Sequence, residues 1–186
     1  MLENCSIILC EGDINSLDYQ IYGKLFANKK VIPCGSNSIL KVKEEKLKGH
    51  ENVCAITDRD VLSSSDIEDL LKEDIYTLKV RAIENVLVID LVLNYICKKE
   101  NIKEFETVTN NIKHILFNKY GKRLNKQFEF NINDDNILKF YNPKKVIDTV
   151  ALMLNMSKRE YLNSFFDILE DHTFSEKIKR CILDIK

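Results

Sequence analysis

The pattern of apolar and polar positions divides the chain into a first part of alternating strands and helices and a second part made of helices. Short apolar runs, typical of strands in a parallel sheet covered on both faces, occupy residues 6–11, 30–34, 52–58 and 75–80. The segments between them, 16–27, 38–47 and 65–72, have the spacing or the caps of helices, and Ser65 to Glu68 predicts a capping box. Strands and helices that alternate in this way predict a parallel sheet with right-handed crossovers.

The second part of the chain carries helical patterns at residues 83–98, 107–120, 144–154 and 157–184. We therefore expect an α/β domain with about four parallel strands over residues 1–90 and a helical C-terminal region over residues 91–186 that packs on it. If the strand order is 2-1-3-4, the first and third strands are neighbours and the order reverses between them. Open α/β sheets bind their ligands at such a point, beyond the carboxyl ends of the strands.

Acidic residues stand where two of the predicted strands end. Glu11 follows the first strand, and Asp58-Arg59-Asp60 follows the third. Three carboxylates gathered at one edge repel one another unless a cation or a proton lies between them. On an extended segment the side chains of Asp58 and Asp60 leave the same face, about 6–7 Å apart. The pattern predicts a site for a divalent cation; the alternative is a solvated loop with local ion pairs.

Further charged residues lie near the same predicted edge. Asp18 is either a second metal ligand or a carboxylate stabilised by the dipole at a helix N-terminus. Lys79 and Arg81 follow the fourth strand, where positive charge would neutralise a scissile phosphate. Glu84 is either another metal ligand or the partner of Arg81 in an ion pair at helical spacing. Gly35-Ser36-Asn37-Ser38 could cradle a phosphate, but it lacks a Walker pattern and a turn followed by a helix cap is the favoured interpretation.

Composition restricts the class of protein. Net charge is −1, yet residues 98–126 hold eight lysine and arginine residues against three glutamates. Aromatic residues interleave with this basic stretch, as a stacking surface for single-stranded nucleic acid or as helix core. The six cysteines form no CxxC pair, which favours reduced thiols in an intracellular protein. No apolar run reaches membrane-spanning length, so we expect a cytoplasmic protein without a membrane partner.

Four motifs together resemble a known family. Ile8 to Gly12, Ser16-Leu17-Asp18, Asp58-Arg59-Asp60 and Val80 to Asn85 are similar, in order and spacing, to TOPRIM-like domains related to the OLD (overcoming lysogenization defect) nucleases. More specifically, the motifs resemble the bacterial branch found beside or fused to ABC-type ATPases in anti-phage defence systems such as PARIS. It covers about residues 5–95. The turn at residues 35–37 and the element at 80–85 depart from the family pattern.

The resemblance implies a Rossmann-like TOPRIM fold and a phosphodiesterase site with one or two Mg²⁺ or Mn²⁺ ions. Glu11, Asp58 and Asp60 match the metal-binding carboxylates of the family, and Asp18 and Glu84 match further acidic positions. We therefore expect a nuclease that acts on DNA or RNA, with Lys79 or Arg81 assisting catalysis. Because the sequence has no ATP-binding motif, control by ATP would come from a partner ATPase. The alternatives are a non-catalytic Mg²⁺-binding regulatory or partner-binding module, and a small phosphotransferase or phosphohydrolase.

Overall fold

The computed structural model describes residues 2–35, 44, 48–49, 52–60, 62–103, 105–126, 132–133 and 136–183. The chain folds into two compact units. The first, which we call the sheet unit, comprises residues 1–79 and 172–186, and the second, the helical unit, comprises residues 80–171. The domain boundary predicted near residue 90 stays a prediction, because these units group residues that contact one another, whereas a domain is a part that folds alone.

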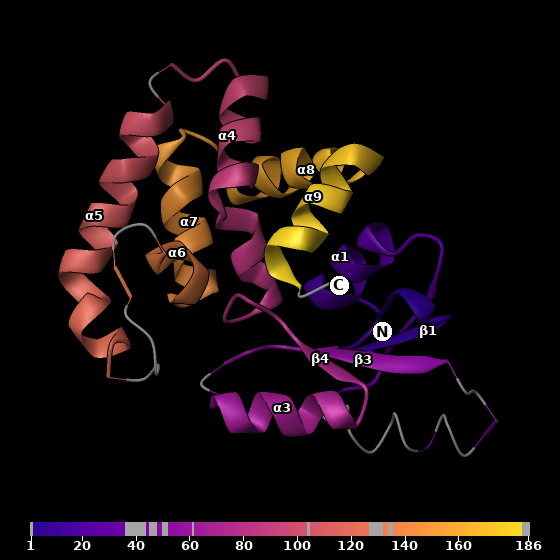
Figure 1. Ribbon diagram of the computed structural model, residues 1–186. Coiled ribbons are helices and arrows are strands. Elements are labelled where there is room, and N and C mark those ends of the chain that lie inside the picture. Colours follow the sequence, from indigo (N-terminus) through magenta and orange to yellow (C-terminus); the bar gives the residue numbers. More distant parts are fainter. Residues whose placement is uncertain are drawn as a thin grey trace. The chain divides into compact units, whose positions relative to one another are not determined.

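The sheet unit contains a four-stranded parallel sheet with the strand order β2-β1-β3-β4, as the sequence predicts (Figure 1). The strands are β1 (Ile7–Cys10), β2 (Lys30–Pro33), β3 (Val53–Thr57) and β4 (Ile75–Thr77). In register, Ile8 of β1 lies between Val31 of β2 and Cys54 of β3. The predicted α/β fold class is therefore confirmed, although β4 ends at residue 77 and not at residue 80.

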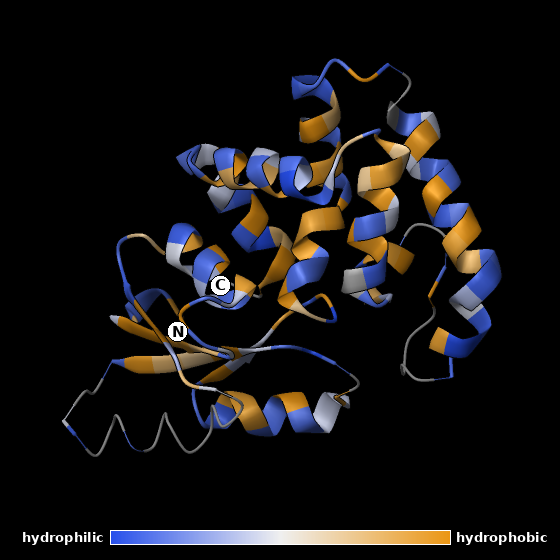
Figure 2. Ribbon diagram, turned by 180° about the vertical axis from the view of Figure 1, so that it is seen from behind, coloured by the Kyte–Doolittle hydropathy of each residue, from blue (hydrophilic) through white to orange (hydrophobic). Residues whose placement is uncertain are grey.

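Helices cover both faces of this sheet, which explains why all four residues of β1 are buried. Helix α3 (Ser64–Lys72) lies on one face and α1 (Leu17–Leu25) on the other, and both views in Figures 1 and 2 show the strands between them. The apolar side chains on the α3 side form one cluster with Leu70: Ile7, Leu9, Val53, Ala55 and Ile75. Helix α1 buries Ile21, Tyr22 and Leu25. Successive side chains of a strand alternate between the two faces, so both faces need apolar residues.

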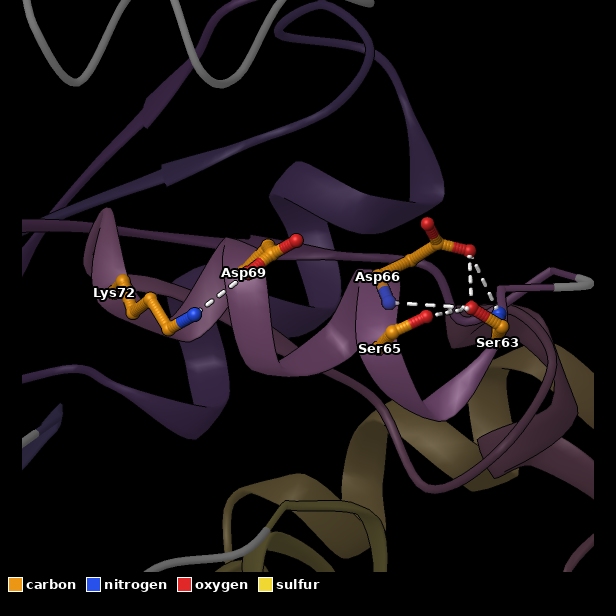
Figure 3. Close-up of polar contacts among 5 residues, drawn as sticks. All are labelled: Ser63, Ser65, Asp66, Asp69 and Lys72. Carbon is orange, nitrogen blue, oxygen red and sulfur yellow. Dashed lines mark hydrogen bonds and ion pairs between the residues drawn. The ribbon is translucent and has the colours of Figure 1, made fainter.

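The start of α3 differs from the prediction in its capping residue. The hydroxyl of Ser63 accepts a hydrogen bond from the Asp66 backbone N–H at 3.2 Å, and the Asp66 carboxylate accepts from the Ser63 N–H at 2.9 Å (Figure 3). The capping box therefore begins at Ser63, so the prediction of Ser65 as the cap was wrong. The sequence pattern does not distinguish the two caps, because Asp66 lies three residues after Ser63 just as Glu68 lies three residues after Ser65.

The last element of the sheet unit comes from the end of the chain. Helix α9 (His172–Ile182) belongs to this unit, and the Lys179 ammonium lies 4.9 Å from the ring centre of Phe26, just after α1. The short η1 (Leu2–Asn4) opens the chain. The helix predicted at residues 38–47 lies outside the described residues except for Glu44, which is helical. The Gly35-Ser36-Asn37-Ser38 phosphate cradle also falls outside them beyond Gly35.

The helical unit contains one 3₁₀ helix and several α-helices. They are η2 (Ile83–Val88), α4 (Asp90–Lys99), α5 (Phe105–Leu124), α6 (Ile137–Phe140), α7 (Pro143–Met153) and α8 (Lys158–Leu169). The predicted helix 83–98 is thus divided at Ile89, whose backbone is extended. The predicted helix 157–184 is divided into α8 and α9. Ser157 caps α8 as predicted, with its hydroxyl accepting from the Glu160 N–H at 3.2 Å.

Buried polar contacts hold η2 inside the helical unit. The hydroxyl of Tyr161 donates to the Leu87 carbonyl at 2.5 Å. The side chain of the fully buried Asn85 forms hydrogen bonds with the backbone of Ala82, Leu138 and Tyr141. A buried polar group must be paired to avoid a desolvation cost of 1–3 kcal/mol or more, so such contacts fix the position of the segment. All six cysteines carry free thiols, which agrees with their spacing. Within the described residues, no helix is both long enough and apolar enough to cross a membrane.

Candidate metal site at the carboxyl edge of the sheet

Glu11 is held at the end of the neighbouring strand. It follows β1, and the hydroxyl of Thr57, the last residue of β3, donates a hydrogen bond of 2.5 Å to its carboxylate. The two residues lie 46 positions apart in the sequence, and they meet because β1 and β3 are adjacent and parallel. Asp58 is the next residue after Thr57. The bond therefore directs the Glu11 carboxylate toward the strand end from which Asp58 continues.

The loop after Glu11 depends on a glycine. Gly12 forms an antiparallel bridge to Gly35, with N–H to carbonyl bonds of 3.1 and 3.0 Å in the two directions, and its φ is 81°. A Cβ atom at this position would lie 2.5 Å from the Ser16 hydroxyl oxygen. Ser16 in turn caps α1 by accepting from the Tyr19 N–H. The close approach that only glycine allows therefore sets where α1 begins, and with it the place of Asp18 in the first turn.

Three of the predicted carboxylates act on the same buried groups. Burial raises the pKa of the Tyr22 hydroxyl well above its usual value, and the negative charges of Asp58, Asp18 and Glu11 raise it further. Burial also raises the pKa of the Cys10 thiol to about 12, with Asp18 and Glu11 among the charges that add to the effect. Charges influence a group in this way only when they are near it. Negative potential is therefore concentrated around the end of β1 on the α1 side of the sheet.

The Asp58-Arg59-Asp60 segment bends before its last residue. Asp58 and Arg59 are half-buried, whereas Asp60 is exposed and has a φ of 41°. The Leu62 N–H donates to the Arg59 carbonyl at 3.0 Å, which closes a turn here. Because the backbone is not extended at Asp60, the alternation of an ideal strand does not determine where its side chain lies. Across the residues that the structure describes, no three His, Cys, Asp or Glu side chains already form a group that could hold a metal ion.

The two predicted cationic residues, Lys79 and Arg81, belong to different units. The Lys79 ammonium donates to the Arg180 carbonyl at 3.3 Å, and the Lys79 N–H donates to the Ile182 carbonyl at 2.8 Å. Lys79 therefore interacts with the last turn of α9, where a helix dipole favours positive charge. Arg81 and Glu84 belong to the helical unit, where the Arg81 N–H donates to the Lys139 carbonyl. Glu11, Asp18 and Asp58 belong to the sheet unit, and the negative charge of each raises the pKa of the Tyr22 hydroxyl.

Two threonines at the sheet edge were missed by the sequence analysis. Thr57 orients Glu11, and Thr77 is its partner in the register of β3 and β4. The Thr77 hydroxyl oxygen is buried and has no hydrogen-bond partner within the described part of the chain. A polar residue that ends an otherwise apolar strand, directly before an acidic motif, was the signal available for Thr57. No acidic motif follows Thr77, so the sequence offered no comparable signal for it.

Comparisons with known proteins add a distant structural similarity. No family model matches the chain, and no curated protein matches it. A solved structure of the C-terminal region of the OLD protein from Xanthomonas campestris pv. campestris is similar, with 13% sequence identity and a TM-score of 0.32, over 94% of this chain and 95% of that one. The match is weak, so the fold and the site rest on the residues described above.

Proposed function

We propose that this protein is a metal-dependent nuclease whose Mg²⁺ or Mn²⁺ site is built on Glu11 and Asp58, with Asp60 and Asp18 as further ligands. The observation that carries the proposal is the Thr57–Glu11 hydrogen bond of 2.5 Å, which ties the carboxylate after β1 to the strand end before Asp58. Carboxylates at the carboxyl end of a parallel sheet are the ligand type that Mg²⁺ takes, with water and substrate phosphate completing its coordination.

The effect on Tyr22 is a second support. Asp58, Asp18 and Glu11 all raise its pKa, so their charges converge on one buried hydroxyl. Like charges in one region cost free energy unless a cation offsets them. Because no three ligands are already grouped within the described residues, cation binding requires Asp58 or Asp18 to turn toward Glu11. We therefore expect affinity in the range of exchangeable Mg²⁺ and not of a permanently bound structural ion.

The chain's own residues have separate roles in this proposal. Thr57 orients the Glu11 carboxylate, and Lys79 and Arg81 stay the predicted ligands of a substrate phosphate. Lys79 is the weaker candidate for the second role, because its ammonium already donates to the Arg180 carbonyl. Glu84 remains a predicted further ligand. A bound divalent ion would supply an activated water and stabilise the leaving oxygen.

The test compares three carboxylate variants in one assay. Glu11→Gln and Asp58→Asn should abolish Mn²⁺ binding measured by calorimetry, and should slow cleavage of labelled oligonucleotides by at least about 100-fold, because a lost ligand removes several kcal/mol of charge stabilisation. Asp13→Asn is the matched control. The Asp13 side chain is exposed and accepts from the Asn15 N–H, and asparagine keeps that acceptor oxygen.

The outcomes separate the proposal from its alternatives. Cleavage that is equal in the wild type and all three variants indicates a contaminating nuclease and refutes the assignment. Mn²⁺ binding that depends on Glu11 without cleavage of DNA or RNA favours the regulatory Mg²⁺-binding module. Release of phosphate from nucleotides without strand cleavage favours a phosphohydrolase. The partner ATPase of a defence system stays a prediction from the resemblance, so the assay is run both on the isolated chain and with cell extract containing ATP.

A further inference from the structure

A cationic pocket lies wholly within the helical unit. Its volume is about 190 Å³, and its lining residues come from the segment before η2, from α5, and from the α6–α7 connection with the start of α7: Arg81, Tyr120, Arg123, Leu124, Tyr141, Asn142 and Lys145. Three of these residues carry positive charge, and none carries negative charge. A concave site with one sign of charge concentrates ligands of the opposite sign.

Two of the pocket's cations, Arg123 and Lys145, keep their charge available for a ligand. Among the described residues, no carboxylate forms an ion pair with Arg123 or Lys145. Both side chains act on the tyrosines at the base of the pocket. Arg123 favours ionised Tyr141, although burial raises the Tyr141 pKa, and Lys145 helps to lower the pKa of Tyr120, after the larger effects of hydrogen bonds from Tyr141 and Lys119. Arg123 and Lys145 therefore lie near enough to the two tyrosines for their charges to act on them.

The pocket has a rigid wall. The rings of Tyr120 and Tyr141 stack with their centres 4.4 Å apart, and Tyr141 is buried. The Tyr141 carbonyl accepts from the Asn85 side-chain amide at 3.0 Å, which ties the wall to η2. Stacked aromatic side chains and a buried amide tether lose little conformational freedom on ligand binding. The pocket is therefore already formed for a ligand.

The size of the pocket selects among anions. Pockets that enclose a whole small-molecule ligand usually measure roughly 300–1,000 Å³. At about 190 Å³, this pocket has space for a phosphate group and not for an entire nucleotide. Further cations lie beyond it: Lys119 is exposed on α5, and Lys126 is exposed two residues after that helix ends. A ligand that fills the pocket with one phosphate and extends along this helix must carry several phosphates in a row.

We propose that this pocket binds a backbone phosphate of a nucleic-acid strand that extends along α5. Arg123 donates to the phosphate oxygens through its planar guanidinium, the geometry best suited to phosphate, and Lys145 and Arg81, which line the same pocket, add positive charge. The choice of nucleic acid as the ligand rests on the proposed function. The binding itself is independent of the metal site and is measured without metal.

The experiment uses fluorescence anisotropy of a labelled single-stranded oligonucleotide in EDTA at 150 mM salt. Arg123→Gln and Lys145→Gln should each weaken binding by about tenfold, because a charge-assisted hydrogen bond to phosphate is lost. Lys122→Gln is the matched control: the same change of charge, one residue away on the same helix, at a side chain that does not line the pocket. It should weaken binding by less than about threefold. Circular dichroism confirms folding, and Arg123→Lys serves as a second variant with an intermediate loss.

Three results would overturn the proposal. An equal loss in Lys122→Gln and Arg123→Gln would show a diffuse electrostatic surface with no specific pocket. Unchanged affinity in Arg123→Gln and Lys145→Gln would show that the strand binds elsewhere. Competition by inorganic phosphate or pyrophosphate at the concentration of the oligonucleotide would assign the pocket to a free phosphate. EDTA removes divalent ions, so the anisotropy result does not depend on whether the proposed metal site exists. Conversely, if the pocket does not bind the oligonucleotide, the Mn²⁺ titration of Glu11→Gln still tests the metal site.

Discussion

Replacing Asn85 by alanine should destabilise the helical unit more than any surface substitution. Asn85 is 0% exposed and makes three hydrogen bonds to backbone. Its amide donates to the carbonyls of Leu138 at 2.7 Å and Tyr141 at 3.0 Å, and its oxygen accepts from the Ala82 N–H at 3.1 Å. One residue thus connects the start of η2 with both ends of the α6 region.

The magnitude follows from these three bonds. Each contributes about 1 kcal/mol net, so Asn85→Ala should lower the free energy of unfolding by about 3 kcal/mol, with a further cost because the backbone groups left behind stay buried. Typical domains have 5–15 kcal/mol in total, so the loss is a large fraction. Asn85→Asp should cost at least as much at neutral pH, because it places a carboxylate oxygen against two carbonyl oxygens.

Equilibrium urea unfolding followed by far-ultraviolet circular dichroism measures this effect. Asn110→Ala on the exposed side of α5 is the control, and its free energy of unfolding should lie within about 0.5 kcal/mol of the wild type. If Asn85→Ala lies within about 1 kcal/mol of the wild type, the three bonds do not hold η2 and the argument fails. Asn85→Ala should also weaken oligonucleotide binding, since the amide positions Tyr141 in the pocket wall.

Three other changes test the sheet edge and a helix cap. Thr57→Val removes the hydrogen bond to the proposed ligand Glu11 and should lower Mn²⁺ affinity about tenfold in calorimetry while the fold persists; unchanged affinity would remove the positioning role. Gly12→Ala places a Cβ 2.5 Å from the hydroxyl that caps α1 at a φ of 81°, and should cost about 2 kcal/mol in urea unfolding; a neutral result would contradict the close approach. Hydrogen bonds from Ser63 lower the pKa of Asp66 below its usual 3.8, so their stabilisation is present above that pH and is lost as the pH falls through the lower folded-state pKa. The difference in Tm between wild type and Ser63→Ala should therefore be larger at pH 7 than at pH 2.5, and an equal difference would refute the assignment.

The fold of the sheet unit could be predicted because its signals are local. Apolar runs of strand length alternate with helical segments, and the handedness of parallel crossovers limits their arrangement. These rules allow the order β2-β1-β3-β4, on which the predicted adjacency of the first and third strands depended, and the structure has this order. The division of residues 83–98 into η2 and α4 could not be predicted, because it depends on bonds from Asn85 to residues more than 50 positions away.

The nearness of Glu11 to the end of the third strand was predictable, whereas the metal site itself stays a proposal. The strand ends placed Glu11 and Asp58 at one edge, and the Thr57 hydroxyl supports that neighbourhood. The turn at Asp60 was missed because the prediction continued extended backbone to Asp60, three residues past the end of β3 at Thr57. The role of Lys79 was missed for another reason: its contact with Arg180 is 101 residues away, and no local pattern shows that α9 belongs to the sheet unit.

The segment Val80 to Asn85 shows why a motif cannot be transferred as one functional element. Val80, Ala82 and Ile83 are buried core residues, and Asn85 is a tether between backbone segments. Arg81 lines the cationic pocket of the helical unit. A resemblance across six consecutive positions therefore combines packing, tethering and ligand contact. Because Arg81 lines the pocket whereas Asn85 holds backbone segments together, Arg81→Gln should weaken oligonucleotide binding with the free energy of unfolding retained, and Asn85→Ala should reduce both.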